Sequence, residues 1–180
     1  MPKNNSLSLL YAFCTVLLWA SSYTFTKVAL KFYTPEALGF LRYLFASTGL
    51  LVFAVIKKIK RPRLADLPLF LVSGFTGFTL YVYAFNKGSA SISPATTSVL
   101  VSTAPIITAV IVSIFYKEKI KKLAWLAIIM EFFGIIMITF NEGIYSMNQG
   151  VFWVLVAALA IATYNAWQRR ILKYYKPIEA

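Results

Sequence analysis

The sequence contains no histidine and a single cysteine among its 180 residues. Without histidine, the chain lacks the commonest general base and a principal metal ligand, which counts against most intramembrane hydrolases and metalloenzymes. Cys14 alone cannot form a disulfide within the chain, so it indicates no redox compartment. We therefore expect no catalytic residue, no bound metal and no cofactor.

Charged residues are also scarce, and acidic residues are the scarcest. Asp and Glu together number six, against 18 Lys and Arg, and charged residues make up 13% of the chain. Hydrophobic residues make up 59%, with a mean hydropathy of +0.72, whereas soluble domains are nearer half apolar. The basic residues gather in short runs between long apolar blocks, so the net charge of +12 indicates a membrane surface and no nucleic-acid partner.

Six apolar blocks are long enough to cross a bilayer as helices, which takes about 20 residues each. They are predicted at residues 7–30, 37–56, 68–86, 94–116, 123–140 and 150–168. The first block begins like a signal peptide, with Lys3 before an apolar run, but it continues beyond the length of a signal sequence. We expect it to be an uncleaved helix. The predicted fold class is an all-α, polytopic membrane helix bundle.

Lysine and arginine are concentrated in alternate loops. Residues 57–63, 117–122 and 169–176 each hold at least four of them, whereas the other loops hold fewer. Basic residues favour the cytoplasmic side, so the pattern places these segments and the N-terminus in the cytoplasm. The loops are too short to hold a soluble domain, and any function must therefore lie within the helix bundle.

Part of the sequence repeats at an offset of 142 residues, where residues 20–35 align with residues 162–177. Both copies end in a lysine, an aromatic pair and a proline. Five spans separate the starts of the copies, and because five is odd the second copy begins on the opposite side of the membrane. Inverted repeats are typical of secondary transporters with a site at the midplane. We therefore expect a five-helix repeat over residues 1–145 and, over 146–180, the first helix of an inverted second repeat that lacks four further helices.

Several short segments carry a family resemblance. They are Trp19 to Lys27 (WASSYTFTK), Pro35, Leu41-Arg42-Tyr43, residues 83–95 (YAFNKGSASISPA), residues 102–105 (STAP) and residues 116–119 (YKEK). In order and spacing they resemble EamA-type proteins of the drug/metabolite transporter superfamily. The resemblance implies a ten-helix transporter of two inverted repeats, usually a bacterial inner-membrane exporter or importer of metabolites. The chain departs from that pattern in its length and in Glu131, where the family usually has an apolar residue.

Polar side chains within the spans are costly in a bilayer and need partners or a water-lined cavity. In the fourth span, Ser98, Ser102 and Pro105 recur at spacings of four and three and so share one helix face. We expect this face to line a substrate cavity. Close packing of helices through small residues is the alternative for each hydroxyl.

Aromatic residues supply further cavity-lining candidates. In the third span, Phe78, Tyr81 and Phe85 are expected on one side, where they would suit a partly apolar metabolite. Contact with lipid is the alternative for these aromatics. In the first span, Trp19 and Ser22 share a face.

The repeat aligns Ser22 with Tyr164, so these two residues are expected to face each other across the pseudo-twofold axis. Glu131 lies near the middle of the fifth span, where burial would make it a proton-coupling candidate. A polar contact between helices, or a shallower position, is the alternative for Glu131. Arg42 is expected to extend outward to the interface or to pair with Glu36.

Together these features predict a secondary transporter, a permease or exporter of a small organic metabolite such as an amino acid or a drug-like compound. Its partners are the lipid bilayer and the substrate, with a second chain or a homodimer to complete the fold. The main alternative is a non-transporting subunit, scaffold or truncated relic that needs a partner chain. A lipid-modifying enzyme is disfavoured, because no span contains histidine or aspartate. An open reading frame downstream of codon 180 with four more hydrophobic helices would favour the full transporter.

Overall fold

The computed structural model describes residues 5–59, 61–117, 122–141, 149–177 and 179, and every regular element among them is helical. The elements are α1 (Asn5–Ala29), α2 (Pro35–Ile56), η1 (Leu64–Asp66), α3 (Leu67–Gly74), η2 (Phe75–Leu80), α4 (Tyr81–Ser91), α5 (Pro94–Ser102), α6 (Ala104–Tyr116), α7 (Lys122–Asn141) and α8 (Gln149–Ile171). The prediction of an all-α polytopic bundle is confirmed.

Within the described residues, five helices are long and apolar enough to cross a membrane: Ser8–Ala29, Pro35–Ile56, Leu64–Ser91, Pro94–Tyr116 and Gln149–Ile171. They correspond to five of the predicted spans, and α7 occupies the place of the remaining one. The third span is longer than predicted at both ends. The hydropathy pattern predicted that this span ends at Asn86, but the helix continues to Ser91 because Gly88 and Ser89 are buried within the bundle.

Two spans begin with the same N-cap arrangement. Thr34 and Ser93 occupy the N-cap positions of α2 and α5, and a proline follows each of them. The side-chain oxygen of Thr34 accepts the backbone N–H of Ala37 at 3.2 Å, and that of Ser93 accepts the N–H of Thr96 at 3.0 Å. These bonds satisfy N–H groups that have no partner in the first helical turn, which matters more in a bilayer than in water.

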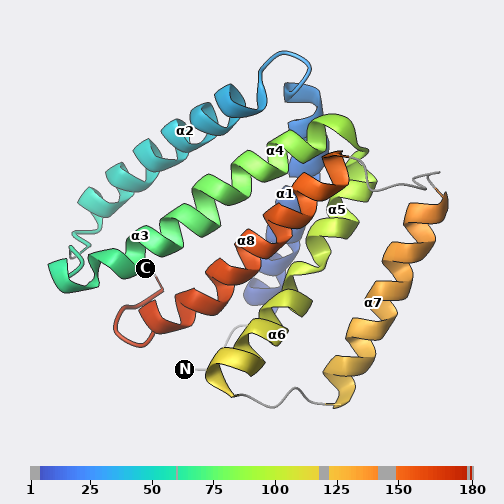
Figure 1. Cartoon of the computed structure of the whole chain (residues 1–180). Coiled ribbons are helices and arrows are strands. Elements are labelled where there is room, and N and C mark those ends of the chain that lie inside the picture. Colours follow the sequence, from blue (N-terminus) through green and yellow to red (C-terminus); the bar gives the residue numbers. More distant parts are fainter. Residues whose placement is uncertain (1–4, 60, 118–121, 142–148, 178, 180) are drawn as a thin grey trace.

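Helix α8 lies at the centre of the arrangement, between α3–α4 on one side and α5–α6 on the other (Figure 1). It runs antiparallel to α1, and α7 stands at the edge of the bundle (Figure 1). The difference in burial is large. In α8, 44% of the most apolar 18-residue window is buried, whereas the share in α1 is 6%.

Two glycines allow α4 and α8 to approach through their backbones. A Cβ atom added at Gly88 would lie 2.5 Å from Cγ2 of Val154 and 2.7 Å from the carbonyl oxygen of Gly150. A Cβ atom added at Gly150 would lie 3.0 Å from the carbonyl oxygen of Gly88. Small residues at such crossings are typical of membrane helices, because lipid tails provide no hydrophobic force between helices and close packing must hold them together. Next to this crossing lies a cluster of buried apolar side chains: Ala84, Phe85, Ile92, Leu100, Val101, Val154 and Ala157.

The C-terminal end of α4 is capped by a lysine from another helix. The Nζ atom of Lys27, near the end of α1, donates to the carbonyl oxygens of Ser89 and Ala90 at 2.9 Å and of Ile92 at 2.8 Å. The last carbonyls of a helix have no partner within it and carry partial negative charge. All three ammonium protons of Lys27 thus bond to carbonyl oxygens at the end of α4. Lys27 therefore stabilises the C-terminal end of this helix.

The segment after α8 is joined to the start of the third span. The hydroxyl of Tyr175 donates to Oδ2 of Asp66 at 2.6 Å and accepts the backbone N–H of Arg63 at 3.0 Å. The ring of Tyr175 packs edge-on against Phe70 at 5.2 Å. The hydrogen bond to Asp66 raises the pKa of Tyr175, since losing its proton would leave two negative groups in contact. These contacts hold the second loop and the C-terminal segment on the same face of the bundle.

We expect Gly88→Ala to destabilise the protein by roughly 1–3 kcal/mol, because the added methyl overpacks the crossing of α4 and α8. Gly49→Ala in α2 is the matched control, since no atom lies within 4 Å of the added Cβ. The control should be neutral or slightly stabilising, since alanine favours helix more than glycine does. Thermal unfolding of the detergent-solubilised chain measures the stability of both variants. Equal stability of the two variants would contradict the close crossing.

We expect Lys27→Gln to destabilise the protein by roughly 1–3 kcal/mol, because it removes charge-assisted hydrogen bonds from the end of α4. Lys31→Gln, four residues later and exposed, removes the same charge and should have little effect. Hydrogen exchange of the backbone amides in the last turn of α4 measures the stability of that turn. Protection that stays unchanged in Lys27→Gln would contradict the capping role.

Candidate functional site

Two cavities along α1 share part of their lining. The α1–α8 cavity has a volume of about 370 Å³ and is lined by Val16, Trp19, Ala20, Tyr23, Tyr81, Val101, Ser102, Ala104, Pro105, Ile161 and Asn165. The α1–α2 cavity has a volume of about 410 Å³ and is lined by Thr15, Leu18, Trp19, Ser22, Arg42, Tyr81 and Phe85. Trp19 and Tyr81 belong to both linings, so these two side chains stand between the cavities.

Most of the residues singled out from the sequence line one of these two cavities. Trp19, Tyr81, Ser102 and Pro105 line the α1–α8 cavity. Ser22 and Phe85 line the α1–α2 cavity, together with Trp19 and Tyr81. The structure thus brings together residues from α1, α4, α5 and α6 that are far apart in the sequence.

The hydroxyl groups at this site are held by their own helices. Ser22 donates to the carbonyl oxygen of Trp19 at 2.6 Å, and Ser102 donates to that of Val99 at 2.6 Å. Ser98 donates to the carbonyl of Ala95 at 2.8 Å and lines neither cavity. With their protons used within the helix, Ser22 and Ser102 can still accept hydrogen bonds from a ligand.

Phe78 and Tyr164 also lie outside both linings, and for Phe78 a π-helical turn accounts for this. Element η2 adds a residue to one turn of the third span, which changes the phase between Phe78 and the later aromatics. Phe78 packs between Tyr43 and Tyr164, with ring centroids 5.7 and 5.6 Å away. Tyr164 lies against Gly77, where an added Cβ would come within 2.4 Å of its ring. The contacts of Tyr164 are therefore with the third span, whereas Ser22 lines the α1–α2 cavity.

The hydrogen-bond partner of Arg42 is one that sequence reasoning did not predict. Its Nη1 atom donates to the hydroxyl of buried Thr26 at 3.2 Å and not to Glu36, and its side chain lines the α1–α2 cavity; its expected extension toward the interface stays a prediction. Arg42 and Glu36 are six residues apart on a helix, so they point in directions about 120° apart. The position of Arg42 well inside an apolar span was the feature of the sequence that indicated a role in the site.

Tyr23 and Asn165 were also missed. The ring of Tyr23 packs edge-on against Phe85 at 5.6 Å, and Tyr23 shares the α1–α8 cavity with Asn165. Asn165 is a polar residue within an apolar helix, which is the signal that could have identified it. Together they add a hydroxyl and an amide to the polar groups of the cavity.

Glu131, the proton-coupling candidate, belongs to α7, but its side chain lies outside the described residues. No cluster of three or more potential metal-ligating residues occurs in the described part of the chain.

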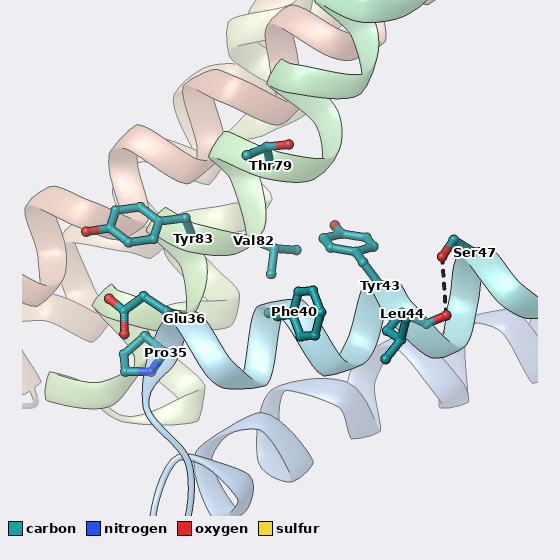
Figure 2. Close-up of a pocket in the computed structure, with 10 residues that line it drawn as sticks. Pro35, Glu36, Phe40, Tyr43, Leu44, Ser47, Thr79, Val82 and Tyr83 are labelled. Atoms are coloured by element: carbon teal, nitrogen blue, oxygen red, sulfur yellow. Dashed lines mark hydrogen bonds between the residues drawn. The ribbon is translucent and has the colours of Figure 1, made fainter.

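A third cavity, of about 460 Å³, lies between α2 and the third span (Figure 2). Its lining is Pro35, Glu36, Gly39, Phe40, Tyr43, Leu44, Ser47, Thr79, Val82 and Tyr83. Figure 2 shows Glu36 and Tyr83 at one end and Ser47 at the other, with Phe40 and Val82 between them. This cavity is larger than the other two, but none of the substrate-cavity candidates predicted from the sequence lines it. We therefore regard the paired cavities at Trp19 and Tyr81 as the candidate site.

Comparison with known proteins agrees with this architecture. The sequence profile described as the EamA-like transporter family matches residues 6–140. "Uncharacterized transporter YdfC" of Bacillus subtilis is 38% identical over 160 residues, which cover 88% of this chain and 52% of that protein. An "Uncharacterized transporter" of Archaeoglobus fulgidus is 33% identical and covers 91% of this chain and 58% of its own length.

A third relative, the "Probable terminal-alkyne amino-acid exporter" of Streptantibioticus cattleyicolor, is 28% identical over 92% of this chain and 56% of its own. The chain thus spans about half the length of the curated relatives it matches. These names describe transporters and not enzymes. No solved structure matches the chain significantly.

Proposed function

Because the chain is a multi-pass membrane protein that belongs to the EamA-like transporter family, we propose that it moves a small organic metabolite across the cell membrane as a secondary transporter. An amino acid with an apolar side chain is the substrate class we favour. The Streptantibioticus relative is named for amino-acid export, and a site walled by Trp19 and Tyr81 suits an apolar side chain.

The observation that carries this proposal is the meeting of two cavities at Trp19 and Tyr81. Trp19 lies near the middle of the span Ser8–Ala29, far from either water-facing end. Around it, aromatic rings alternate with hydroxyl, amide and guanidinium groups. Polar groups in the interior of a bilayer are energetically unfavourable unless they bond to one another, to water or to a substrate. A site of this kind at mid-depth is what alternating access requires.

The ends of α1 and α8 support the proposed inverted repeat, with residues 1–145 as the first copy and 146–180 as the start of the second. The N–H groups of Leu30 and Tyr33 donate to Thr26 and Ala29, and at an offset of 142 residues those of Leu172 and Tyr175 donate to Gln168 and Ile171. The two helices thus end in the same hydrogen-bonded turn while running in opposite directions (Figure 1).

The repeat also bears on how the site is completed. Helix α8 is packed against the third and fourth spans of the first copy, whereas its counterpart α1 is largely exposed. By symmetry, α1 would pack against the third and fourth spans of a complete second copy. We propose that such helices close the open side of both cavities. The exposure of α1 equally suits the alternative role of a subunit that depends on its partner.

We propose an inner-membrane location with the N-terminus in the cytoplasm. The contacts of Tyr175 hold the second loop and the C-terminal segment on one face, and both segments are rich in lysine and arginine. This arrangement follows the positive-inside pattern. Glu131 in α7 is our candidate for coupling transport to protons.

Reconstitution of the 180-residue chain into proteoliposomes tests transport directly. We expect uptake of L-phenylalanine or L-leucine above that of protein-free vesicles. Trp19→Ala should reduce uptake roughly tenfold, because losing an aromatic contact with the substrate costs on the order of 1 kcal/mol or more. Trp125→Ala in α7 is the matched control, since Trp125 lines none of the three cavities. No uptake across amino acids and drug-like compounds, or equal loss in both variants, would contradict the proposal.

Coupling to protons is tested in the same vesicles. With an imposed pH gradient, we expect uptake by the wild-type chain to rise and Glu131→Gln to lose that increase while keeping exchange at equal pH. A gradient response that survives in Glu131→Gln would remove Glu131 from this role.

A further inference from the structure

Arg42 lies at a depth where a positive charge is expensive. It follows Pro35 by seven residues in α2, which places it about 10 Å along the helix from its start. A charged side chain within a membrane span is costly and usually faces a water-filled cavity or an opposite charge. Arg42 lines the α1–α2 cavity, and its side chain is exposed there.

The described part of the chain supplies no negative partner for this guanidinium. Its one side-chain hydrogen bond is the 3.2 Å contact from Nη1 to the neutral hydroxyl of Thr26. Among the acidic residues with described side chains, Asp66 is bonded to Tyr175 and Glu179 to the backbone of Lys176, both near the end of α8. Glu36 lines the separate cavity between α2 and the third span.

The surroundings of Arg42 differ from those of Lys27, a cation near the end of α1. The ammonium group of Lys27 is satisfied by three carbonyl oxygens at the end of α4. The guanidinium of Arg42 has five N–H donors, of which one meets Thr26. Its remaining donors can hold a carboxylate through two parallel hydrogen bonds, a geometry that arginine favours.

The rest of the α1–α2 cavity indicates what such a carboxylate would be attached to. Trp19, Tyr81 and Phe85 form aromatic walls, and Thr15 and Ser22 add hydroxyls. Trp19 and Tyr81 also border the α1–α8 cavity, which offers space for an apolar side chain. One end of the combined site is therefore cationic and the remainder is aromatic.

We propose that Arg42 binds the carboxylate group of the transported substrate and thereby selects small organic acids, amino acids among them, that carry an apolar or aromatic portion. This inference rests on the proposed transport function and adds to it the chemical group that is recognised. Arg42 acts as a specificity-determining residue: it holds one end of the substrate while Trp19 and Tyr81 contact the other.

The test compares amino acids with their amides, in which an uncharged carboxamide replaces the carboxylate, on the full chain in phosphatidylcholine nanodiscs. The probes are L-phenylalanine with L-phenylalaninamide and L-leucine with L-leucinamide, titrated calorimetrically. We expect the acid to bind roughly 10- to 100-fold more tightly than its amide, because the amide loses the charge-assisted hydrogen bonds. This comparison needs no variant, so it decides the question even if substitutions at Arg42 impair folding.

Variants then assign the preference to Arg42. Arg42→Gln should weaken binding of the acid to the level of the amide and leave the amide unchanged, and Arg42→Lys should keep part of the preference. Lys57→Gln, an exposed residue at the other end of α2, removes the same charge and should behave as wild type. A purely structural role would weaken acid and amide alike.

Three results would overturn the inference. Equal binding of acid and amide by the wild-type chain would do so while leaving transport intact, as would equal weakening of both by Arg42→Gln. If Arg42 instead binds a lipid phosphate, the acid and the amide will bind equally. Absence of binding and uptake for every probe would overturn the proposed function for amino acids, and this inference with it.

Discussion

The close crossing of α4 and α8 is the contact on which the rest of the structure depends. Gly88 and Gly150 let the two backbones touch, with the carbonyl oxygen of each helix at the position where the other would carry a side chain. In a bilayer this is an efficient way to hold helices together, since burying apolar side chains gains little over contact with lipid. The crossing fixes the position of α8 and so sets Asn165 opposite Trp19 and Tyr81.

The polar groups of the bundle show how the bilayer constrains the site. Lys27 and Arg42 come from neighbouring helices, and a membrane interior demands partners for both. Lys27 meets three carbonyl oxygens that the end of α4 leaves open, so its charge is used to complete the fold. Arg42 meets only one neutral hydroxyl and faces a cavity. One cation thus serves stability, and the other remains accessible to a ligand.

Sequence reasoning located the spans because hydropathy and length depend on the order of apolar residues along the chain and not on how the helices pack. It also identified Trp19 and Tyr81, which the structure places together. It did not foresee the separation of Phe78 from the site, because a π-helical turn shifts the helical phase and leaves no clear mark in the sequence. It did not predict the partner of Arg42, because the partner of a charged side chain depends on how α1 and α2 are placed in the bundle, which periodicity does not specify.

The most direct test of this account is whether α8 is seated on α4. A Cβ atom added at Gly150 would lie 3.0 Å from Cβ of Ser91, close enough for a disulfide after slight adjustment. In a Cys14→Ser background, the pair Ser91→Cys and Gly150→Cys should form an intramolecular disulfide in native membranes on mild oxidation. The control pair Gly49→Cys and Gly150→Cys should not. Failure of the first pair to cross-link, with both thiols detected by alkylation after denaturation, would contradict the position of α8 and with it the site built around Trp19 and Tyr81.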